Sequence, residues 1–283
     1  MLPSPIEAPL TLRMWQGERF FRWCSSFVNL DFRAPAIRSE VMKPFLLLGT
    51  RAIDRAADNE YEAMLHYAGL EEGQLRRVRM ERGPLGPIRL DDFSGVILGG
   101  GPFNSSDVRK SAVQIRVEAE ISALLDQIVS RDFPFLGACY GIGTLGVHEG
   151  AVVDRTFAEP VGPTMISLTE EGRADRLFQG LPDRFEAFLG HKEAIAKLPE
   201  HAVNLASSAA CPVQAFRVGS NVYATQFHPE LDLAGIEVRI DVYKHAGYFE
   251  PHEADALKTR ARASSVVHPP ALLRRFVELF SRG

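Results

Sequence analysis

Short apolar segments alternate with longer amphipathic ones from residue 42 onward. The apolar segments have the length and composition of buried strands and cover residues 45–48, 75–80, 95–98 and 133–136. Between them, residues 56–67 have apolar positions at helical spacing and are followed by Gly69, a residue type that commonly ends helices. This succession of strand and helix predicts an α/β fold in which a mainly parallel sheet carries helices on both faces.

The longest amphipathic segment, residues 108–130, predicts a helix that packs one face on this sheet. The apolar positions expected on that face are Ala112, Ile115, Ala119, Ile121, Leu124 and Leu125. Ligands of such folds bind at the carboxyl ends of the parallel strands. We therefore expect catalytic or ligand-binding residues in the loops that follow residues 98 and 136.

The second half of the chain is richer in strand patterns. The predicted strands cover residues 164–168, 185–189, 203–206, 213–218 and 221–226. Gly219 and Ser220 predict a two-residue hairpin turn between the last two. Helical patterns then cover residues 233–243, 252–263 and 270–280. We expect one main domain over residues 42–245 and a C-terminal helical tail over residues 246–283.

Residues 1–41 do not share this pattern. They contain prolines, scattered aromatic side chains and mixed charge. The arginines of this segment suggest a transit peptide, but acidic residues interrupt it, and it lacks the apolar stretch of a secretory signal. We expect an N-terminal extension that packs poorly and has no catalytic role, although a start assigned upstream of the true one would give the same composition.

Composition narrows the functional class. The net charge of −4 among 283 residues, without a stripe of Lys and Arg, argues against nucleic-acid binding. No apolar run approaches the roughly 20 residues of a membrane helix. The three cysteines have no Cys-x-x-Cys spacing, which favours a reducing, cytoplasmic setting. No Cys/His cluster has metal-ligand spacing, so we expect neither a metal nor a cofactor.

Cys139 is the strongest candidate for chemistry. It lies where a predicted strand meets a turn of small residues and a helix begins. Such an elbow holds a nucleophile clear of the backbone, and the helix N-terminus favours negative charge on the sulfur. The other thiols have ordinary interpretations, because Cys211 at a strand start is expected to be buried and inert, and Cys24 lies in the extension.

A histidine and a carboxylate complete a candidate triad. The segment 224–230 reads Ala-Thr-Gln-Phe-His-Pro-Glu, so His228 and Glu230 follow a strand and point roughly the same way. Cys139 would attack a carbonyl, His228 would transfer the proton and Glu230 would orient the imidazole. In the loop after residue 98, Gly100 and Gly101 would let backbone N–H groups approach a negatively charged oxygen.

These motifs resemble those of the class I (triad-type) glutamine amidotransferases, most of all the glutaminase domain of GMP synthase. The family elbow, Gly-x-Cys-x-Gly-x-Gln, matches residues 137–141 but not the final Gln. The family's Gly-Gly-Pro loop followed by Ser matches residues 100–105, and its last signature matches residues 226–230. A looser match over residues 190–199 contains His191 and Glu193. The resemblance covers about residues 42–241.

The resemblance implies a flavodoxin-like fold and hydrolysis of the glutamine side-chain amide through a γ-glutamyl thioester on Cys139, with release of ammonia. The oxyanion donors would be the backbone N–H groups of Gly101 and Tyr140. His191 and Glu193 would help to bind substrate. Because no phosphate-binding loop follows the triad motifs, an ATP-dependent synthetase that accepts the ammonia would be a separate chain.

The family's elbow Gln is replaced by Gly143. If a contact to glutamine is simply missing, Gly143→Gln should improve hydrolysis. If a neighbouring side chain fills the space, the same substitution should clash, and residues near 191–193 would hold the substrate instead. The departure leaves two other hypotheses open: a hydrolase of another γ-glutamyl compound, and a non-catalytic module of this fold, against which the complete set of triad residues argues.

The same glycines offer a competing motif. Gly141, Gly143 and Gly146 spell the Gly-x-Gly-x-x-Gly of dinucleotide-binding folds. In those folds a helix of several turns follows the glycines, whereas Gly150 ends this one after about two turns and strand-like residues 151–153 follow. We therefore interpret the glycines as close-packing positions in a short elbow helix.

Overall fold

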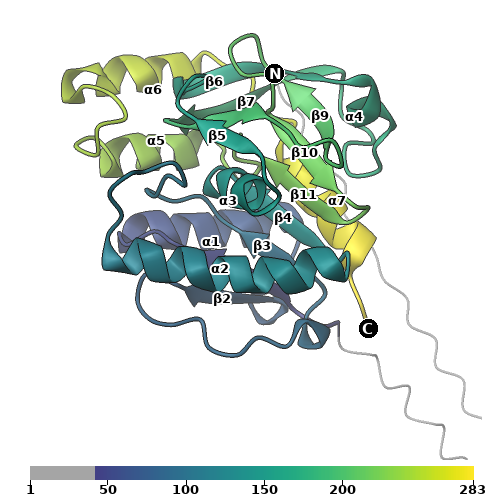
Figure 1. The fold of residues 1–283 in the computed structure, drawn as a ribbon. Coiled ribbons are helices and arrows are strands. Elements are labelled where there is room, and N and C mark those ends of the chain that lie inside the picture. The colour runs from purple at the N-terminus through teal and green to yellow at the C-terminus, as the bar shows by residue number, and fades with distance from the viewer. Residues whose placement is uncertain (1–41) are drawn as a thin grey trace, which may run out of the picture. The chain divides into compact units, whose positions relative to one another are not determined.

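Nine strands form the central sheet of residues 42–283, the part of the chain that the computed structural model describes (Figure 1). Their order is β2-β1-β3-β4-β11-β10-β9-β6-β7. The first five of these run parallel and are β2 (Leu75–Arg79), β1 (Phe45–Gly49), β3 (Val96–Leu98), β4 (Phe135–Ala138) and β11 (Val222–Thr225). The expectation about residues 1–41 lies outside the described residues.

The remaining strands of the sheet pair antiparallel. They are β10 (Ala215–Val218), β9 (Val203–Ser207), β6 (Glu159–Leu168) and β7 (Arg184–His191). A separate two-stranded sheet consists of β5 (Val152–Asp154) and β8 (Ala194–Lys197). The strand β8 was not predicted, and β6 begins earlier than residue 164 because its register shifts between Glu159 and Gly162. That bulge accommodates a Gly- and Pro-rich stretch that does not look like a strand.

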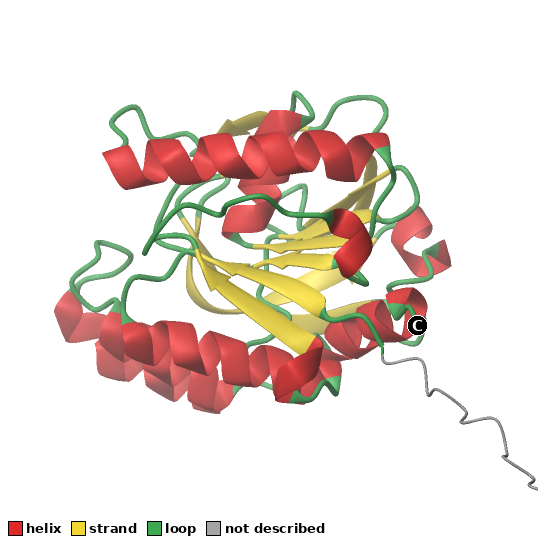
Figure 2. Ribbon diagram, turned by 90° about the horizontal axis from the view of Figure 1, so that it is seen from below, coloured by secondary structure: helices red, strands yellow, loops and turns green. Residues whose placement is uncertain are grey.

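Helices cover both faces of the sheet, as predicted (Figure 2). The helices are α1 (Asp54–Ala68), α2 (Ala112–Ser130), α3 (Tyr140–His148), α4 (Glu170–Ala174), α5 (Leu233–Val242), α6 (Ala254–Arg262) and α7 (Pro270–Phe280). Three short 3₁₀ turns cover Glu72–Gln74, Leu90–Asp92 and Pro251–Glu253. The short α3 is followed by a turn at Gly150 and then by β5, which confirms the interpretation of the glycine motif as an elbow helix.

Side chains of β1 alternate between two cores. Phe45 and Leu47 belong to the core that α1 and α7 cover, whereas Leu46 and Leu48 belong to the one that α2 and α3 cover. A strand points successive side chains to opposite faces, so a continuous apolar run is needed when both faces are buried. Each buried side chain of this size contributes about 1.5–3 kcal/mol relative to exposure.

The helix α2 differs from the prediction in its start and in its buried face. Ser111 caps it by accepting a hydrogen bond at Oγ from the Gln114 N–H (3.1 Å), so the helix begins at Ala112 instead of Val108. The buried face consists of Gln114, Val117, Ile121, Leu124, Leu125 and Ile128. The expected core positions Ala112, Ile115 and Ala119 are exposed, Ile115 by 57%. A polar residue takes an inner position because the Gln114 amide donates to the carbonyl of Asn104 (2.9 Å).

The hairpin between β10 and β11 has a three-residue turn, one residue longer than predicted. Val218 pairs with Val222, and Gly219 adopts a left-handed conformation with φ 57°. The Asp132 carboxylate accepts hydrogen bonds from the N–H groups of Ser220 and Asn221, both at 2.9 Å. A distant carboxylate thus satisfies the donors of the longer turn.

The helices of segment 246–283 pack on the rest of the structure. The helix α6 shares a small apolar core with α5. The helix α7 lies against α1, and the ring of Phe276 is 5.8 Å from that of Phe45. The Lys43 N–H donates to the carbonyl of Arg282 (2.8 Å), so the first and last parts of the described chain are joined.

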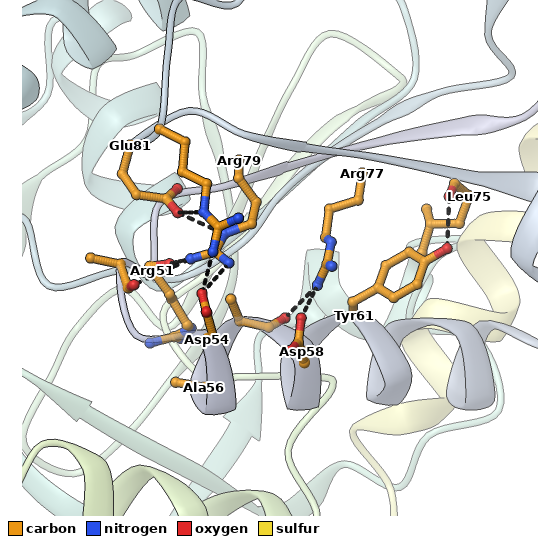
Figure 3. Close-up of polar contacts among 12 residues, drawn as sticks. Arg51, Asp54, Ala56, Asp58, Tyr61, Leu75, Arg77, Arg79 and Glu81 are labelled. Carbon is orange, nitrogen blue, oxygen red and sulfur yellow. Dashed lines mark hydrogen bonds and ion pairs between the residues drawn. The ribbon is translucent and has the colours of Figure 1, made fainter.

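Polar contacts join β2 to the start of α1 (Figure 3). Arg79 bonds the carboxylates of Asp54 and Glu81, each at 2.6 Å, and its Nη2 donates to the carbonyl of Arg51 (2.8 Å). Of these contacts, the ion pair with the exposed carboxylate of Asp54 adds at most about 1 kcal/mol. The contacts also fix the position of a loop, because Arg79 holds the backbone of the loop that carries Arg51.

Candidate active site

Four neighbouring parallel strands end at the same edge of the sheet. Thr50 and Arg51 follow β1, the glycine loop follows β3, Cys139 follows β4, and His228 comes shortly after β11. The carboxyl ends of adjacent parallel strands lie side by side, so segments far apart in sequence meet at one place. The structure brings the predicted candidate residues together at this edge, and Arg51, which the sequence did not single out, lies beside them.

Cys139 adopts an unusual backbone conformation. Its φ of 53° lies in the left-handed region, which is uncommon for a residue other than glycine. The Cys139 N–H donates to the carbonyl of Thr225 (2.8 Å), which fixes the elbow on β11. A Cβ placed on Gly137 would lie 2.8 Å from the carbonyl carbon of Gly141, so the tight turn requires glycine. Tyr140 begins α3, and its N–H is one of the helix's N-terminal donors.

His228 and Glu230 form a buried hydrogen-bonded pair. The distance between His228 Nδ1 and Glu230 Oε1 is 2.8 Å, and Glu230 is 0% exposed. Burial alone would lower the pKa of His228, but the negative charge of Glu230 and the neighbouring Cys139 thiol raise that pKa to about 9. For Glu230, burial would raise the pKa, whereas the His228 imidazolium and its hydrogen bond lower it to about 2. The pair therefore favours imidazolium beside carboxylate.

Gly100 lies at the point where three functional groups converge. A Cβ placed on it would lie 2.5 Å from His228 Cε1, 2.7 Å from Arg51 Nη2 and 3.4 Å from Cys139 Cβ. The Gly100 carbonyl accepts a hydrogen bond from Thr50 Oγ1 (3.3 Å), and a Cβ on Gly101 would overlap the same hydroxyl. Glycine is thus required for the loop to pack this closely on the imidazole and on Thr50.

Glu193 occupies the space beside Gly143. A Cβ placed on Gly143 would lie 2.8 Å from Glu193 Oε1 and 3.2 Å from Ser105 Oγ. The two carboxylate oxygens of Glu193 accept hydrogen bonds from the N–H groups of Ser105 and Ser106, each at 2.7 Å. The side chain missing at position 143 therefore leaves no gap, because a carboxylate fills the space and holds the loop after β3.

His191 supports the segment that carries Glu193. Its Nε2 lies 3.0 Å from Glu159 Oε2 and its Nδ1 lies 2.9 Å from the carbonyl of Glu193. Ser208 donates to the other oxygen of Glu159 (2.9 Å). Both imidazole nitrogens of His191 thus contact protein groups, so this histidine positions the Glu193 segment.

Two cavities meet at Cys139. The Arg51 cavity has a volume of about 60 Å³, and its walls include Arg51, His228, Ile236, Arg239, Tyr243 and Phe249. The Glu193 cavity is smaller, about 10 Å³, and its walls include Phe103, Tyr140, Gly143, His191, Glu193 and Gln226. Gly101, Cys139, Gly190 and Tyr248 line both. Glu230 lies behind His228 and lines neither.

Two arginines share one carboxylate beneath the Arg51 cavity. Arg51 Nε donates to Glu60 Oε1 (2.8 Å) and Arg51 Nη1 donates to the Tyr243 hydroxyl (3.2 Å), while Arg239 Nη2 lies 4.0 Å from Glu60 Oε1. Burial opposes the charge on Arg51, but Glu60 raises its pKa above the ordinary value. Burial and the charge of Arg51 lower the pKa of Arg239 to about 10. The negative charges of Glu60 and Glu230 both act on these arginines, so two guanidinium groups and two buried carboxylates lie around this cavity wall.

The Cys211 thiol contrasts with Cys139. It is fully buried, its Sγ lies 3.4 Å from the carbonyl of Val213, and burial raises its pKa to about 11. Its expected burial is confirmed. Among residues 42–283, no group of three or more His, Cys, Asp or Glu side chains is arranged to hold a metal ion. None of the described helices is long and apolar enough to cross a membrane.

The model of the glutamine amidotransferase class-I family matches residues 56–237, well over half of the chain. The chain belongs to this family. A Thermococcus kodakarensis relative, a subunit of glutamine-hydrolysing GMP synthase, is 29% identical over 182 residues, which cover 64% of this chain and 86% of the relative. The corresponding subunit from Thermoplasma acidophilum is 31% identical over 144 residues, which cover 50% of this chain and 66% of the relative. The resemblance to GMP synthase glutaminases is confirmed.

Other relatives are much longer than the region they share with this amidotransferase. The match to GMP synthase from Petrotoga mobilis is 28% identical over 159 residues and spans only 28% of that protein. Among solved structures, a glutamine amidotransferase from Thermotoga maritima has a TM-score of 0.68, with 22% identity over 84% of this chain and 98% of its own. One from Methylobacillus flagellatus has a TM-score of 0.65, with 18% identity over 86% of this chain and 97% of its own. These structures confirm the predicted fold class.

Proposed function

We propose that this amidotransferase hydrolyses the side-chain amide of glutamine through a thioester on Cys139 and releases ammonia. The observation that carries the proposal is the convergence of Cys139, His228 and Arg51 on Gly100 at the elbow, with Glu230 buried behind the imidazole. The family match and the names of the glutamine-hydrolysing relatives support the choice of reaction.

In the proposed mechanism, His228 holds the proton of the Cys139 thiol while the sulfur attacks the amide carbon. The oxygen that becomes negatively charged accepts hydrogen bonds from the N–H groups of Gly101 and Tyr140. His228 then donates its proton to the nitrogen, the C–N bond breaks and ammonia leaves. Glu230 accepts from Nδ1 of His228, which directs Nε2 toward the sulfur and stabilises the charged imidazole.

Hydrolysis of the thioester uses the same groups. His228 removes a proton from a water molecule, the oxygen attacks the thioester carbon, and the C–S bond breaks to give glutamate and free Cys139. Glu193 acts as a positioning residue in this scheme, because its two bonds to the N–H groups of Ser105 and Ser106 hold the loop that includes Gly101.

The test compares two cysteines of the same chain. Cys139→Ala should lower the rate of glutamate release from glutamine by several orders of magnitude, whereas Cys211→Ala should lower it little. A diazoketone analogue of glutamine should add to Cys139, as peptide mass spectrometry would show. Turnover that survives in Cys139→Ala, or an adduct on Cys211 with Cys139 unmodified, would contradict the assignment.

We also propose that a separate synthetase chain uses the ammonia, because two of the relatives are named as individual subunits of GMP synthase. A candidate synthetase without a glutaminase domain should use ammonia alone but glutamine only when this chain is added. Cys139→Ala should abolish the glutamine-dependent reaction and leave the ammonia-dependent one. A synthetase that uses glutamine equally well without this chain would exclude the pairing.

A further inference from the structure

The segment between α5 and the 3₁₀ turn at Pro251–Glu253 passes along the candidate active site. Tyr243 and Phe249 of this segment line the Arg51 cavity, and Tyr248 lines both cavities together with Cys139. Burial, and then the charge of the Cys139 sulfur, raise the pKa of the Tyr248 hydroxyl above its ordinary value, so each side chain is within reach of the other's charge. Tyr248 therefore stands beside the sulfur, at the point where the two cavities meet.

Lys192 joins this segment to the opposite wall of the site. It lies between His191 and Glu193, in the turn from β7 to β8, and lines the Glu193 cavity. Its Nζ donates to the carbonyl of Ala246 (3.0 Å) and lies 4.2 Å from the centroid of the Tyr248 ring. One ammonium group thus holds both the backbone and the aromatic ring of the segment.

The segment is anchored at its two ends and loosely attached between them. At one end, the Tyr243 hydroxyl accepts a hydrogen bond from Arg51 Nη1 (3.2 Å), and at the other Phe249 packs against the apolar core that α5 and α6 share. Residues 245–247 are exposed, and Gly247 has a φ of 72°, which glycine adopts without strain. Within the described part of the chain, the bond from Lys192 is the one hydrogen bond that joins residues 244–248 to residues outside 243–249.

The space around Cys139 is small when the segment lies in this position. The two cavities have volumes of about 60 and about 10 Å³, and a cavity needs roughly 10–15 Å³ for one water-sized group. Together they hold roughly five to seven such groups, fewer than the heavy atoms of glutamine. If glutamine is the substrate, part of the wall must move before it reaches the sulfur. Residues 244–248 are the part of the wall with few attachments.

We propose that residues 244–248 form a lid that Lys192 holds closed over Cys139, and that the Tyr248 ring determines the size of the molecules that reach the sulfur. When the lid is closed, the ring stands beside Cys139 and admits only small molecules. When Lys192 releases the lid, residues 244–248 turn away about their ends at Tyr243 and Phe249, and larger molecules enter. Only the identity of the admitted substrate rests on the proposed function.

Two thiol reagents of different size test the role of the ring. Iodoacetamide is small and N-phenylmaleimide is bulky, and peptide mass spectrometry gives the rate constant at which each modifies Cys139. The ratio of the bulky to the small rate constant should rise roughly tenfold or more in Tyr248→Ala, because a packed side chain excludes the atoms of other molecules. If Tyr248→Ala does not fold, Tyr248→Leu also removes the ring and keeps an apolar side chain.

Tyr61→Ala is the matched control for loss of the ring. This half-buried tyrosine also packs under a cation, since Arg77 Cζ lies 4.6 Å from its ring centroid, but it lines neither cavity (Figure 3). Its removal should leave the ratio of rate constants unchanged.

Lysine variants test whether the lid is held closed. Lys192→Met removes the ammonium group and should raise the same ratio roughly threefold to tenfold, through loss of one hydrogen bond and one cation–π contact. Lys192→Arg keeps the positive charge and should restore most of the wild-type ratio. Lys197→Met, at an exposed position of β8 that lines neither cavity, should leave the ratio unchanged.

The outcomes for the lid and for the proposed function are separate, because alkylation of Cys139 does not require turnover. An unchanged ratio in Tyr248→Ala, or an equal rise in Tyr61→Ala, would overturn the inference and leave glutamine hydrolysis by the wild type intact. An unchanged ratio in Lys192→Met would show that the ring is a fixed wall and would exclude a lid held by Lys192. A raised ratio in both variants, with no glutamate released from glutamine by the wild type, would support the lid and contradict the proposed function.

Discussion

Adding one methyl group at Gly143 should impair this amidotransferase. The new Cβ of Gly143→Ala would lie 2.8 Å from Glu193 Oε1, closer than such contacts occur, so the carboxylate must move. That carboxylate holds the N–H groups of Ser105 and Ser106 at 2.7 Å each. The structure therefore supports the alternative in which a neighbouring side chain fills the space, and Gly143→Gln should lower activity.

The size of the effect follows from those two hydrogen bonds. A hydrogen bond to a charged group contributes about 1.5–3 kcal/mol, and about 1.4 kcal/mol corresponds to a factor of ten. If the shift of Glu193 weakens one bond and displaces the loop that carries Gly101, kcat/KM for glutamine should fall roughly tenfold or more. Steady-state glutamate release well below the melting temperature measures this loss.

Gly146→Ala is the matched control. It adds a methyl group to the same helix, but its Cβ meets the end of the Ile195 side chain and not Glu193. It should lower the melting temperature with little change in kcat/KM. In a Glu193→Ala background, Gly143→Ala should cost much less than it does in the wild type. The reasoning would be refuted if Gly143→Ala kept wild-type kcat/KM, or if its cost were the same in both backgrounds.

Three further predictions concern stability. The pKa of Glu230 is lowered from 4.5 to about 2, so its contribution to the stability of the fold is complete above pH 4.5 and is lost as the pH falls toward 2. The pKa of His228 is raised from 6.5 to about 9, so its contribution to stability is complete below pH 6.5 and is lost as the pH rises through 9. The melting temperature of the wild type should thus exceed that of Glu230→Gln most between pH 4.5 and 6.5, and a pH-independent difference would contradict the pairing. Phe276→Ala, at a 0% exposed position of α7, should cost about 3–5 kcal/mol in urea unfolding, and a cost below about 1 kcal/mol would show that α7 is dispensable. Ser111→Ala should cost about 1 kcal/mol through loss of the α2 cap, and an unchanged midpoint would exclude that role.

The elements that carry the chemistry were predictable because their local sequences are nearly unambiguous. A buried parallel strand needs an uninterrupted apolar run, and the tight contacts at Gly137 and Gly100 exclude any other residue type. Apolar runs followed by glycines therefore allow the strands and the turns at their carboxyl ends to be predicted from the sequence. The positions of Cys139, His228 and Glu230 at that edge follow from strand order.

Residues whose roles depend on distant partners were not predictable in this way. Arg51 is one of 32 Lys and Arg residues, and only the pairing of β1 with β3 brings it to Gly100. Gln114 takes an inner position on α2 because of a carbonyl ten residues earlier, which hydrophobicity alone does not reveal. Glu193 was singled out by the looser family match over residues 190–199, but its position beside Gly143 depends on the fold.

The position of α7 has a consequence for how the chain folds during synthesis. This helix covers the face of β1 that carries Phe45 and Leu47, yet it is made after every other described element. At translation rates of roughly 5–20 residues per second, the completed β1 and α1 wait about ten to forty seconds for it. During that interval their apolar face is exposed to water and to other nascent chains. The ribosome-bound intermediate should therefore be the species most prone to aggregation and most dependent on chaperones.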